Sequence, residues 1–334
     1  MEHHILVTIP HGEVMDTFFP ADVRAELEAL GTVSWNPHDR QFTATELAEA
    51  VKGVDTVFTG WGVCPFSQEV LASAGSLQIL AHTGGSVAAV ATQELYQAGA
   101  RVLSGNRIYA QSVAEGVVAY MLMALRRLPN YLDMMCRQGW HSGIWQNQGL
   151  LGKRVGVIEF GAVARALVEL LRPFGVQVVV SADHLTEQEA AALNVEKSTT
   201  EEIFRTCPIV TLHGALTEQT RHSITGALLA QMPQGSLFIN TARGALVEEQ
   251  ELAQVLAQRP DMQAVLDVYE HEPLPLDSPL RQLPNAYLIP HMAGPTMDRR
   301  PAVTRGLIRD VQNVWNGVPA VLEISAEHAR RMSI

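Results

Sequence analysis

The stretch GKRVGVIEFGAVARALVELL, residues 152–171, combines an apolar run, a glycine turn and a long amphipathic pattern. The run at 155–158 predicts a buried strand, and the pattern after the turn predicts a helix. A strand that enters a helix in this way is typical of the β-α-β units of parallel sheets. The spacing approaches G-x-G-x-x-G, a phosphate-binding turn, with Gly161 in the second place and Ala164 in the third. The first place holds Glu159 instead of glycine.

The altered turn is weak evidence alone, because an ordinary strand-to-helix turn has the same pattern. A carboxylate beside a pyrophosphate is repulsive by ~1 kcal/mol at ~4 Å in water, and a Cβ at this place removes the freedom of glycine. Neither cost removes the N-terminus of the following helix or the backbone N–H groups of Ala162 and Val163. The Glu159 side chain can also turn outward, for example toward Arg165.

The composition of the chain limits its class. A length of 334 residues favours two domains. The formal net charge of −11 argues against a nucleic-acid partner, because phosphate backbones require concentrated Lys and Arg. The sequence contains neither the ~18 uninterrupted apolar residues of a membrane span nor a secretory signal pattern at its start. Three separated cysteines without C-x-x-C spacing suit a reducing compartment, so we expect a cytoplasmic protein with no metal site.

Short apolar runs alternate with helical patterns along most of the chain. This alternation predicts an α/β protein with two doubly wound parallel-sheet domains joined by two helices. We expect one domain at 1–104 and 300–334, and the other at 105–299. The apolar runs of the first domain are at 4–10, 54–60 and 77–85. Those of the second are at 155–158, 176–181, 207–214, 235–241, 262–269 and 286–291.

Two segments between these series have a distinct character. Residues 112–128 predict a long helix, with Ser112 as its N-cap and Glu115 three residues later as a capping box. The following stretch, 138–149, is rich in Trp, Gly and Gln and carries little periodicity.

Three consecutive predicted strands of the second domain are each followed by a chemically active side chain. Arg243, Glu272 and His291 occur in the phrases INTARGALV, LDVYEHEPL and LIPHMAGPT. Ligands of parallel sheets bind beyond the carboxyl ends of the strands, so we expect the three residues to share one edge. Arg can hold a carboxylate by two hydrogen bonds, and His beside a carboxylate is a suited proton donor. Each residue has an ordinary structural explanation alone, but their joint placement favours a catalytic site.

Together these phrases resemble the D-isomer-specific 2-hydroxyacid dehydrogenases, the family of D-glycerate, D-3-phosphoglycerate and D-lactate dehydrogenases. The matching segments are SVAE (112–115), GKRVGVI-FG (152–161), TLHGALTEQTRH (211–222), FINTARGALVEE (238–249), LDVYEHEPLPLDSPL (266–280) and PHMAGPT (290–296). They cover essentially the whole second domain, whereas the first domain resembles the family by pattern more than by motif. The resemblance implies a flavodoxin-like substrate-binding domain, a Rossmann domain that binds NAD, with NADP not excluded, and a homodimer.

The resemblance also implies roles for the matched residues. Arg243 would bind the substrate carboxylate and carbonyl, His291 would exchange a proton with the carbonyl oxygen, and Glu272 would keep His291 charged. Asp267 would contact the nicotinamide carboxamide, or alternatively cap backbone amides. Asp183 is placed to accept hydrogen bonds from the adenosine ribose, or is a solvated loop residue. The expected cofactor-binding residues are Val113, Gly161, Ala162, Val163, Ala182, Asp183, His213, Gly214, Ala215, Thr220, Thr241, Ala242, Arg243, Asp267, His291 and Gly294.

The substrate loops depart from the family pattern. The expected substrate-binding residues are Trp61, Gly84, Gly85, Ser86, Arg243 and His291. Gly85 and Ser86 stand where the family has a valine-glycine pair, and its following acidic and asparagine residues are missing. Trp61 either covers the substrate's side group or is a packing residue, and His213 has the alternative of a turn histidine bonded to backbone. The loops lack a basic cluster, which argues against a phosphorylated substrate.

The sequence therefore predicts an NAD(P)-dependent oxidoreductase that interconverts a small 2-keto acid and a D-2-hydroxy acid, similar to the glyoxylate/hydroxypyruvate reductases. The alternative is a non-catalytic NAD(H)-sensing or partner-binding protein on the same scaffold, as in the family's corepressor branch. The formate dehydrogenase branch is disfavoured because that branch has a glutamine, not an acid, at the position that corresponds to Glu272. Retention of Arg243, Glu272 and His291 favours catalysis.

Overall fold

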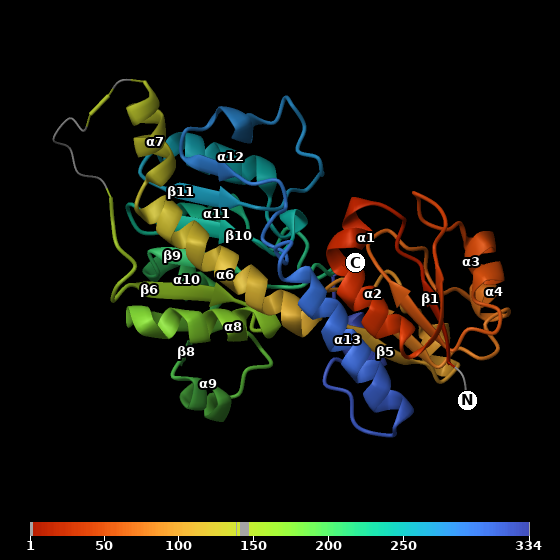
Figure 1. Ribbon diagram of the computed structural model, residues 1–334. Coiled ribbons are helices and arrows are strands. Elements are labelled where there is room, and N and C mark those ends of the chain that lie inside the picture. The colour runs from red at the N-terminus through yellow and green to blue at the C-terminus, as the bar shows by residue number, and fades with distance from the viewer. Residues whose placement is uncertain (1–2, 138, 141–146, 334) are drawn as a thin grey trace. The chain divides into compact units, whose positions relative to one another are not determined.

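The computed structural model describes residues 3–137, 139–140 and 147–333. The chain divides into two compact units, unit 1 (Met1–Ala110 and Pro295–Ile334) and unit 2 (Gln111–Gly294). Each unit contains one sheet whose strands are all parallel (Figure 1). The weakly periodic stretch at 138–149 lies partly outside the described residues.

Unit 1 contains a five-stranded sheet in the order β2-β1-β3-β4-β5. Its strands are β1 (His3–Val7), β2 (Gly31–Trp35), β3 (Thr56–Thr59), β4 (Ile79–His82) and β5 (Arg101–Ser104). Its helices are α1 (Glu13–Phe18), α2 (Ala21–Glu28), α3 (Ala44–Ala50), α4 (Gln68–Leu71), α5 (Gln93–Gln97), α13 (Arg300–Trp315) and α14 (Ala326–Arg330). This is the flavodoxin-like order, in which the ligand crevice lies between β1 and β3.

Helices cover both faces of this sheet, which explains the continuous apolar runs of its central strands. Successive side chains of β1 point to opposite faces. Leu6 packs in the core formed with α3, α4 and α5, whereas Ile5 and Val7 pack with α1, α2 and α13. The edge strand β2, with the sequence GTVSW, was not predicted. Its residues are only partly covered, so the strand forms without an apolar run.

Unit 2 contains a seven-stranded sheet in the order β12-β11-β10-β9-β6-β7-β8. Its strands are β6 (Arg154–Ile158), β7 (Gln177–Ser181), β8 (Glu196–Lys197), β9 (Ile209–Leu212), β10 (Leu237–Asn240), β11 (Gln263–Leu266) and β12 (Ala286–Leu288). Its α-helices are α7 (Leu128–Cys136), α8 (Ala162–Leu171), α9 (Glu187–Leu193), α10 (Thr200–Thr206), α11 (Gly226–Ala230) and α12 (Glu249–Gln258). Its 3-10 turns are η1 (Arg172–Phe174), η2 (Gly244–Leu246) and η3 (Pro279–Gln282). Helix α6 (Asn106–Leu125) begins in unit 1 and continues into unit 2.

The sheet of unit 2 is also covered on both faces. Ile239 of β10 packs in the core with α6 and α8, and the neighbouring Phe238 packs in the core with α10, α11 and α12. The strand order reverses between β6 and β9, which is the switch point where ligands of such sheets bind. The predicted fold class of two doubly wound parallel-sheet domains is confirmed.

The start of α6 differs from the prediction that Ser112 caps a helix at 112–128. The helix begins at Asn106, whose backbone N–H donates to the Ser104 hydroxyl at 3.1 Å. Ser112 lies inside the helix, and its buried hydroxyl has no partner among the described residues. The buried Tyr109 packs in the core of unit 1, so tertiary packing extends the helix past the local capping signal.

Helix α6 is long and apolar enough to cross a membrane by length and composition. The core helix of a soluble protein satisfies the same criterion. Ala114, Val117 and Met121 of α6 are fully buried in the core of unit 2, which accounts for its apolar composition.

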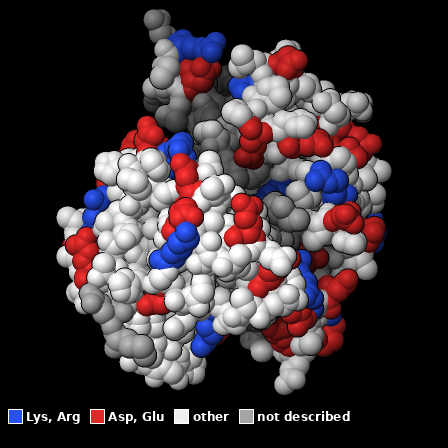
Figure 2. Space-filling model, turned by 90° about the vertical axis from the view of Figure 1, so that its right-hand side faces the viewer, with Lys and Arg blue, Asp and Glu red and all other residues white. Residues whose placement is uncertain are grey.

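Charged side chains are interspersed over the face shown in Figure 2. Lys and Arg stand there in small separate groups among more numerous Asp and Glu. This distribution accords with the net charge of −11. The described part of this face does not form the continuous basic surface on which a phosphate backbone would dock.

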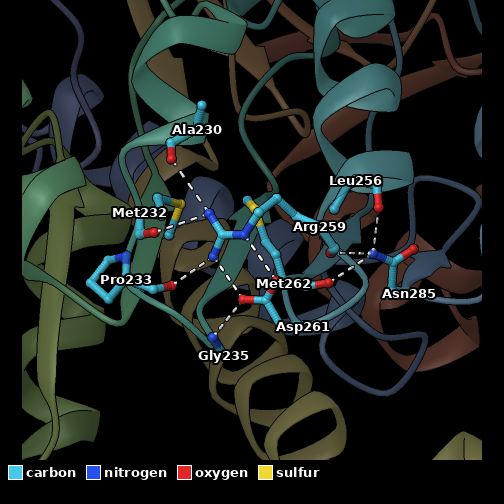
Figure 3. A network of polar contacts seen from close by, with 9 residues as sticks. All are labelled: Ala230, Met232, Pro233, Gly235, Leu256, Arg259, Asp261, Met262 and Asn285. Atoms are coloured by element: carbon cyan, nitrogen blue, oxygen red, sulfur yellow. Dashed lines mark hydrogen bonds and ion pairs between the residues drawn. The ribbon is translucent and has the colours of Figure 1, made fainter.

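A polar network closes the amino-terminal edge of the unit 2 sheet (Figure 3). Arg259 forms an ion pair with Asp261 at 2.7 Å, and Asp261 accepts a hydrogen bond from Gly235 N at 2.9 Å. The amide of Asn285 donates to backbone oxygens that include Met262 O at 2.8 Å. These residues precede β10, β11 and β12, so the network stabilises the edge opposite the carboxyl ends of the strands.

Candidate active site

Arg243 follows β10 at the carboxyl edge of the unit 2 sheet. Asn240, the last residue of β10 and 1% exposed, fixes the turn: its side-chain oxygen accepts from Ala242 N at 3.0 Å, and its amide donates to Arg243 O at 2.9 Å. Gly244 then packs against the next strand end, where an added Cβ would lie 1.8 Å from the Tyr269 carbonyl carbon. Only glycine fits this contact, which determines where the Arg243 backbone lies.

Glu272 and His291 form a hydrogen-bonded pair beside this turn. Glu272 Oε2 lies 2.7 Å from His291 Nδ1, and Glu272 Oε1 accepts from Tyr269 N at 3.0 Å. The carboxylate is therefore held on both oxygens, and it favours a proton on Nδ1 of the imidazole. Nε2 is then the ring atom available to a substrate.

Arg243 is electrostatically coupled to the same carboxylate. Burial lowers the pKa of the Arg243 guanidinium, and the Glu272 carboxylate raises it. A guanidinium remains cationic at all physiological pH values. The structure thus brings Arg243, Glu272 and His291 together from three strand ends.

His222 supports this turn and was missed by sequence reasoning. Its Nε2 lies 2.9 Å from Glu270 Oε1, and its Nδ1 lies 3.0 Å from Glu248 Oε1. Its backbone N–H donates to Ala245 O at 2.8 Å. These contacts join the loop after β9 to the segments on either side of Arg243. The partners are distant in sequence, so no local pattern indicates them.

Asp267 is a buried carboxylate, 1% exposed, at the end of β11. It accepts hydrogen bonds from Met292 N at 2.7 Å, Ala293 N at 3.0 Å and the Tyr120 hydroxyl at 3.2 Å. Asp267 therefore caps backbone amides of the segment that carries His291, as the structural alternative predicts. Its contact with a nicotinamide remains a prediction.

The glycine turn after β6 leads directly into α8. Gly161 is the N-cap residue, and no side chain among the described residues caps the helix. An added Cβ on Gly161 would meet none of the described atoms within 4 Å. The N-terminus of α8, with the N–H groups of Ala162 and Val163, is therefore accessible to an anionic group.

The loop after β9 contains four predicted cofactor residues. His213 Nε2 lies 3.1 Å from Thr211 Oγ1, a side-chain partner and not the backbone partner expected. Burial lowers the pKa of His213 to about 3, so its ring is neutral near pH 7. The Thr220 hydroxyl donates to Ala215 O at 2.7 Å, which fixes the loop conformation. Gly214 lies against the side chain of Glu159.

The remaining predicted cofactor residues differ in exposure. Asp183 is exposed directly after β7, whereas the preceding Ala182 is buried. Val113 is partly buried against the core, and Gly294 has open space around it among the described residues. The Thr241 hydroxyl, just after β10, is buried without a hydrogen-bond partner in the described part of the chain.

Three of these features fit a dinucleotide. They are a helix N-terminus after β6 and a buried hydroxyl after β10, neither of which has a side-chain cap or partner among the described residues, and an acid after β7. All lie at the carboxyl edge near the β6/β9 switch point. By contrast, the described residues contain no cluster of three or more His, Cys, Asp or Glu that could hold a metal ion.

Glu159 adopts a φ of 68°, the left-handed conformation that glycine would supply at this place. Arg165, one candidate partner for this side chain, is engaged elsewhere: it lies 2.6 Å from Glu189 of α9 and stacks over Phe160. Glu159 Oε2 instead lies 3.8 Å from His184 Nδ1, in the loop after β7. The turn directs the side chain toward β7, which the local sequence does not indicate.

In unit 1, Trp61 follows β3 and is 46% exposed. Its ring packs edge-on against Phe18, with centroids 5.3 Å apart, and the Arg300 guanidinium lies 5.4 Å from its centroid. Trp61 borders a cavity of about 110 Å³. The other lining residues are Ile9, Pro10, Val14, Phe18, Gln41, Gly60 and Thr83.

The predicted carboxylate loop follows β4 in the same unit. An added Cβ on Gly84 would lie 2.3 Å from His82 Nε2, so any larger residue would force the buried His82 ring to shift. His82 is 3% exposed, and its Nδ1 lies 2.9 Å from Thr59 Oγ1. The Ser104 hydroxyl contacts Gly84 O and Gly85 O at 3.2 and 2.7 Å. Buried polar contacts thus hold the backbone of the loop.

Ser86, the last predicted substrate residue, uses its hydroxyl within unit 1. The hydroxyl donates to Ser333 O at 2.5 Å and accepts from Ala88 N at 3.3 Å. The side chain therefore stabilises the loop. Its contact with a substrate remains a prediction.

Comparisons with known proteins agree on one family. A family model, "D-isomer specific 2-hydroxyacid dehydrogenase, NAD binding domain", matches residues 118–293. The chain is 28% identical over 276 residues to the D-3-phosphoglycerate dehydrogenase of Methanocaldococcus jannaschii, covering 82% of this chain and 52% of that relative. It is 29% identical over 267 residues to the human glyoxylate reductase/hydroxypyruvate reductase, covering 77% and 80% of the two chains. The chain thus spans about half the length of the first relative.

A solved structure supports the fold over nearly the whole chain. The TT0316 protein of Thermus thermophilus has 26% sequence identity and a TM-score of 0.77, covering 96% of this chain and all of that one. The similarity therefore includes unit 1, which the family model largely leaves out.

Proposed function

The chain belongs to the D-isomer-specific 2-hydroxyacid dehydrogenases and carries their NAD-binding domain, and we propose that it reduces a small 2-keto acid to a D-2-hydroxy acid, or runs the reverse reaction. The observation that carries the proposal is the His291–Glu272 pair at 2.7 Å beside the cationic Arg243. The human relative, named a glyoxylate reductase/hydroxypyruvate reductase, supports the same substrate class.

Each of the three residues has one chemical task. Arg243 binds the substrate carboxylate through its guanidinium and polarises the adjacent carbonyl. His291 Nε2 donates a proton to the carbonyl oxygen, and Glu272 stabilises the imidazolium while it orients the ring. A bound nicotinamide cofactor supplies the hydride that C2 of the substrate accepts. In the reverse direction His291 takes the proton from the substrate hydroxyl.

We infer that NAD is held along the carboxyl edge of the unit 2 sheet. Ala162 and Val163 offer backbone N–H groups to the pyrophosphate at the start of α8. Asp183 accepts hydrogen bonds from the adenosine ribose. The hydroxyl of Thr241, which has no hydrogen-bond partner in the described part of the chain, is a further donor at this edge.

The non-catalytic alternative is not favoured. A sensor of NAD(H) needs only the dinucleotide edge, whereas this chain also keeps a carboxylate that orients His291 and a glycine contact that positions Arg243. Both features serve proton transfer and carboxylate binding. They support catalysis.

For the assembled protein we propose a cytoplasmic homodimer, on the basis of the family resemblance. The three cysteines Cys64, Cys136 and Cys207 are free, which suits a reducing compartment. Sedimentation velocity tests the dimer; a single species of monomer mass at micromolar concentration contradicts it.

The activity is tested by following NADH and NADPH oxidation with glyoxylate, hydroxypyruvate, pyruvate and 2-ketobutyrate, four keto acids that differ in their side groups. We expect turnover with at least one, and loss of at least about 100-fold in kcat/KM for Arg243→Ala and His291→Ala. The matched control is His271→Ala, an exposed histidine beside Glu272, which should retain turnover. Absence of turnover with every acid, or full activity of both variants, contradicts the proposal.

A further inference from the structure

Glu159 occupies a place that favours glycine, yet the turn around it is well ordered by hydrogen bonds. Its φ is 68°, and its backbone N–H donates to Ser181 O at 2.8 Å. His213 N donates to Ile158 O at 2.9 Å on the other side of β6. A side chain in the left-handed region costs about 1–2 kcal/mol. The backbone at residue 159 thus has the left-handed conformation typical of glycine, although the residue carries a carboxylate side chain.

The Glu159 side chain contacts the loops on both sides of β6. Glu159 Cγ lies 3.1 Å from the position of an added Cβ on Gly214, so the base of the side chain packs against the loop after β9. Its Oε2 lies 3.8 Å from His184 Nδ1 in the loop after β7. Around Gly161, by contrast, an added Cβ would meet none of the described atoms within 4 Å. The carboxylate of Glu159 therefore lies by the loop that carries Asp183 and His184.

Asp183 marks the ribose end of a dinucleotide in a sheet of this kind, because the acid after the second strand accepts from the ribose 2′-hydroxyl. A carboxylate beside Asp183 adds negative charge where NADP(H) carries its 2′-phosphate. We propose that Glu159 is a specificity-determining residue that selects NAD(H) against NADP(H) and makes this selection depend on pH. The proposal rests on the nicotinamide-dependent function proposed above.

The charged groups around Glu159 determine the sign of the pH dependence. Burial raises the pKa of the Glu159 carboxyl above its usual value; Asp183 adds to this rise, whereas His184 and a hydrogen bond from the Phe160 backbone oppose it. On α8, Arg165 is engaged by Glu189 at 2.6 Å, so it does not neutralise the turn. On the β9 side, His213 is neutral, since burial lowers its pKa to about 3.

Protonation of Glu159 removes the repulsion, so NADP(H) binding is accompanied by proton uptake. The bound phosphate raises the carboxyl pKa further, and NADPH affinity falls as pH rises through the interval between the free and bound pKa values. One linked proton changes the dissociation constant by at most about tenfold per pH unit. Repulsion between two single charges ~4 Å apart in water weakens binding by about fivefold. Repulsion between one carboxylate and a phosphate of nearly two charges would weaken NADP(H) binding by about 30-fold.

The test is equilibrium binding of NADH and NADPH to the full-length protein, followed by dinucleotide fluorescence and calorimetry at a series of pH values from about 5 to about 8.5, all above the usual pKa of a carboxyl group. Glu159→Gln removes the charge at similar size, and Glu159→Gly also relieves the backbone conformation, which keeps the test valid if the first variant folds poorly. The matched control is Glu169→Gln at the other end of α8, where Glu169 pairs with Arg172 at 2.8 Å.

We expect the wild type to bind NADH more tightly than NADPH. At about pH 8, both Glu159 variants should lower the ratio of the NADPH dissociation constant to the NADH dissociation constant by about fivefold or more. Glu169→Gln should leave this ratio unchanged. The ratio should rise with pH more steeply in the wild type than in Glu159→Gln. Equal ratios in wild type and both Glu159 variants, equal pH slopes, or a wild-type preference for NADPH overturn this proposal alone. Failure of the wild type to bind either dinucleotide overturns it together with the proposed function.

Discussion

The buried His82 predicts a loss of stability of unit 1 on mild acidification. His82 ends β4 directly before the loop of Gly84, is 3% exposed, and contacts the Thr59 hydroxyl at 2.9 Å. Burial lowers the pKa of His82 to about 4, from 6.5 for an unburied histidine. The perturbation is His82→Gln, which removes the titrating ring and keeps an amide that can bond to Thr59.

The magnitude follows from the two pKa values. Above pH 6.5 the ring is neutral in both the folded and the unfolded chain, and its contribution is fully present. As pH falls from 6.5 toward 4, only the unfolded chain takes up the proton, so the free energy of unfolding declines. The loss at about pH 5 is about 2 kcal/mol, and it approaches about 3 kcal/mol at lower pH.

The assay is urea unfolding at about pH 7.5 and about pH 5, on either side of this titration, followed by tryptophan fluorescence. Trp35 packs in the core of unit 1 against Phe19, with ring centroids 5.5 Å apart, and therefore reports its unfolding. With a slope of about 2 kcal/mol per molar urea, the wild-type midpoint should fall about 1 M further than that of His82→Gln. His328→Gln, a change at an exposed histidine, is the control and should behave as the wild type.

The decisive quantity is the difference between the two pH values, not the absolute stability of the variant. If His82→Gln loses as much stability as the wild type on acidification, His82 is not the proton-linked group and the reasoning from its burial is refuted. The same conclusion holds if the free energy of unfolding of His82→Gln falls on acidification by as much as that of the control His328→Gln.

Three further predictions concern unit 2. Gly244→Ala places a Cβ 1.8 Å from the Tyr269 carbonyl carbon, so the backbone must shift. We expect the free energy of unfolding in urea to fall by about 3 kcal/mol and kcat/KM to fall by about 100-fold. Wild-type values of both would contradict the importance of this contact. Glu272→Gln should lower kcat for keto-acid reduction by about 100-fold in stopped-flow assays, because the imidazolium of His291 loses its counter-charge; an unchanged kcat refutes that role. Asn285→Ala removes hydrogen bonds to three backbone oxygens and should cost about 2 kcal/mol by urea unfolding while turnover is retained; a loss of turnover without a loss of stability would place the residue in the site instead.

The fold class and the joint placement of the three candidate residues were predictable because they depend on period and order along the chain. Apolar runs alternating with helical patterns specify parallel sheets covered on both faces. In such a sheet, residues that follow successive strands lie at one edge whatever the detailed packing. Arg243, Glu272 and His291 were therefore placed together from the sequence, and the structure brings them within one hydrogen-bonded and electrostatically coupled group.

Contacts between distant residues decided the rest. Ser112 has a good capping signal, but burial of Tyr109 starts α6 earlier, at Asn106. His222 joins two segments of the site only because the fold brings Glu248 and Glu270 to its two ring nitrogens. Such pairings follow no local pattern, since their energy depends on positions that the folded backbone supplies.

Glu159 shows the same division at a single residue. The sequence alone establishes that a carboxylate stands at the first place of a glycine turn, and it indicates the repulsion and the backbone cost. Only the tertiary structure decides that the turn keeps its left-handed conformation and that the side chain points to His184 and not to Arg165. The physical reason is that the direction of a side chain depends on the backbone dihedral and on neighbours from β7 and β9, which are brought together only by folding.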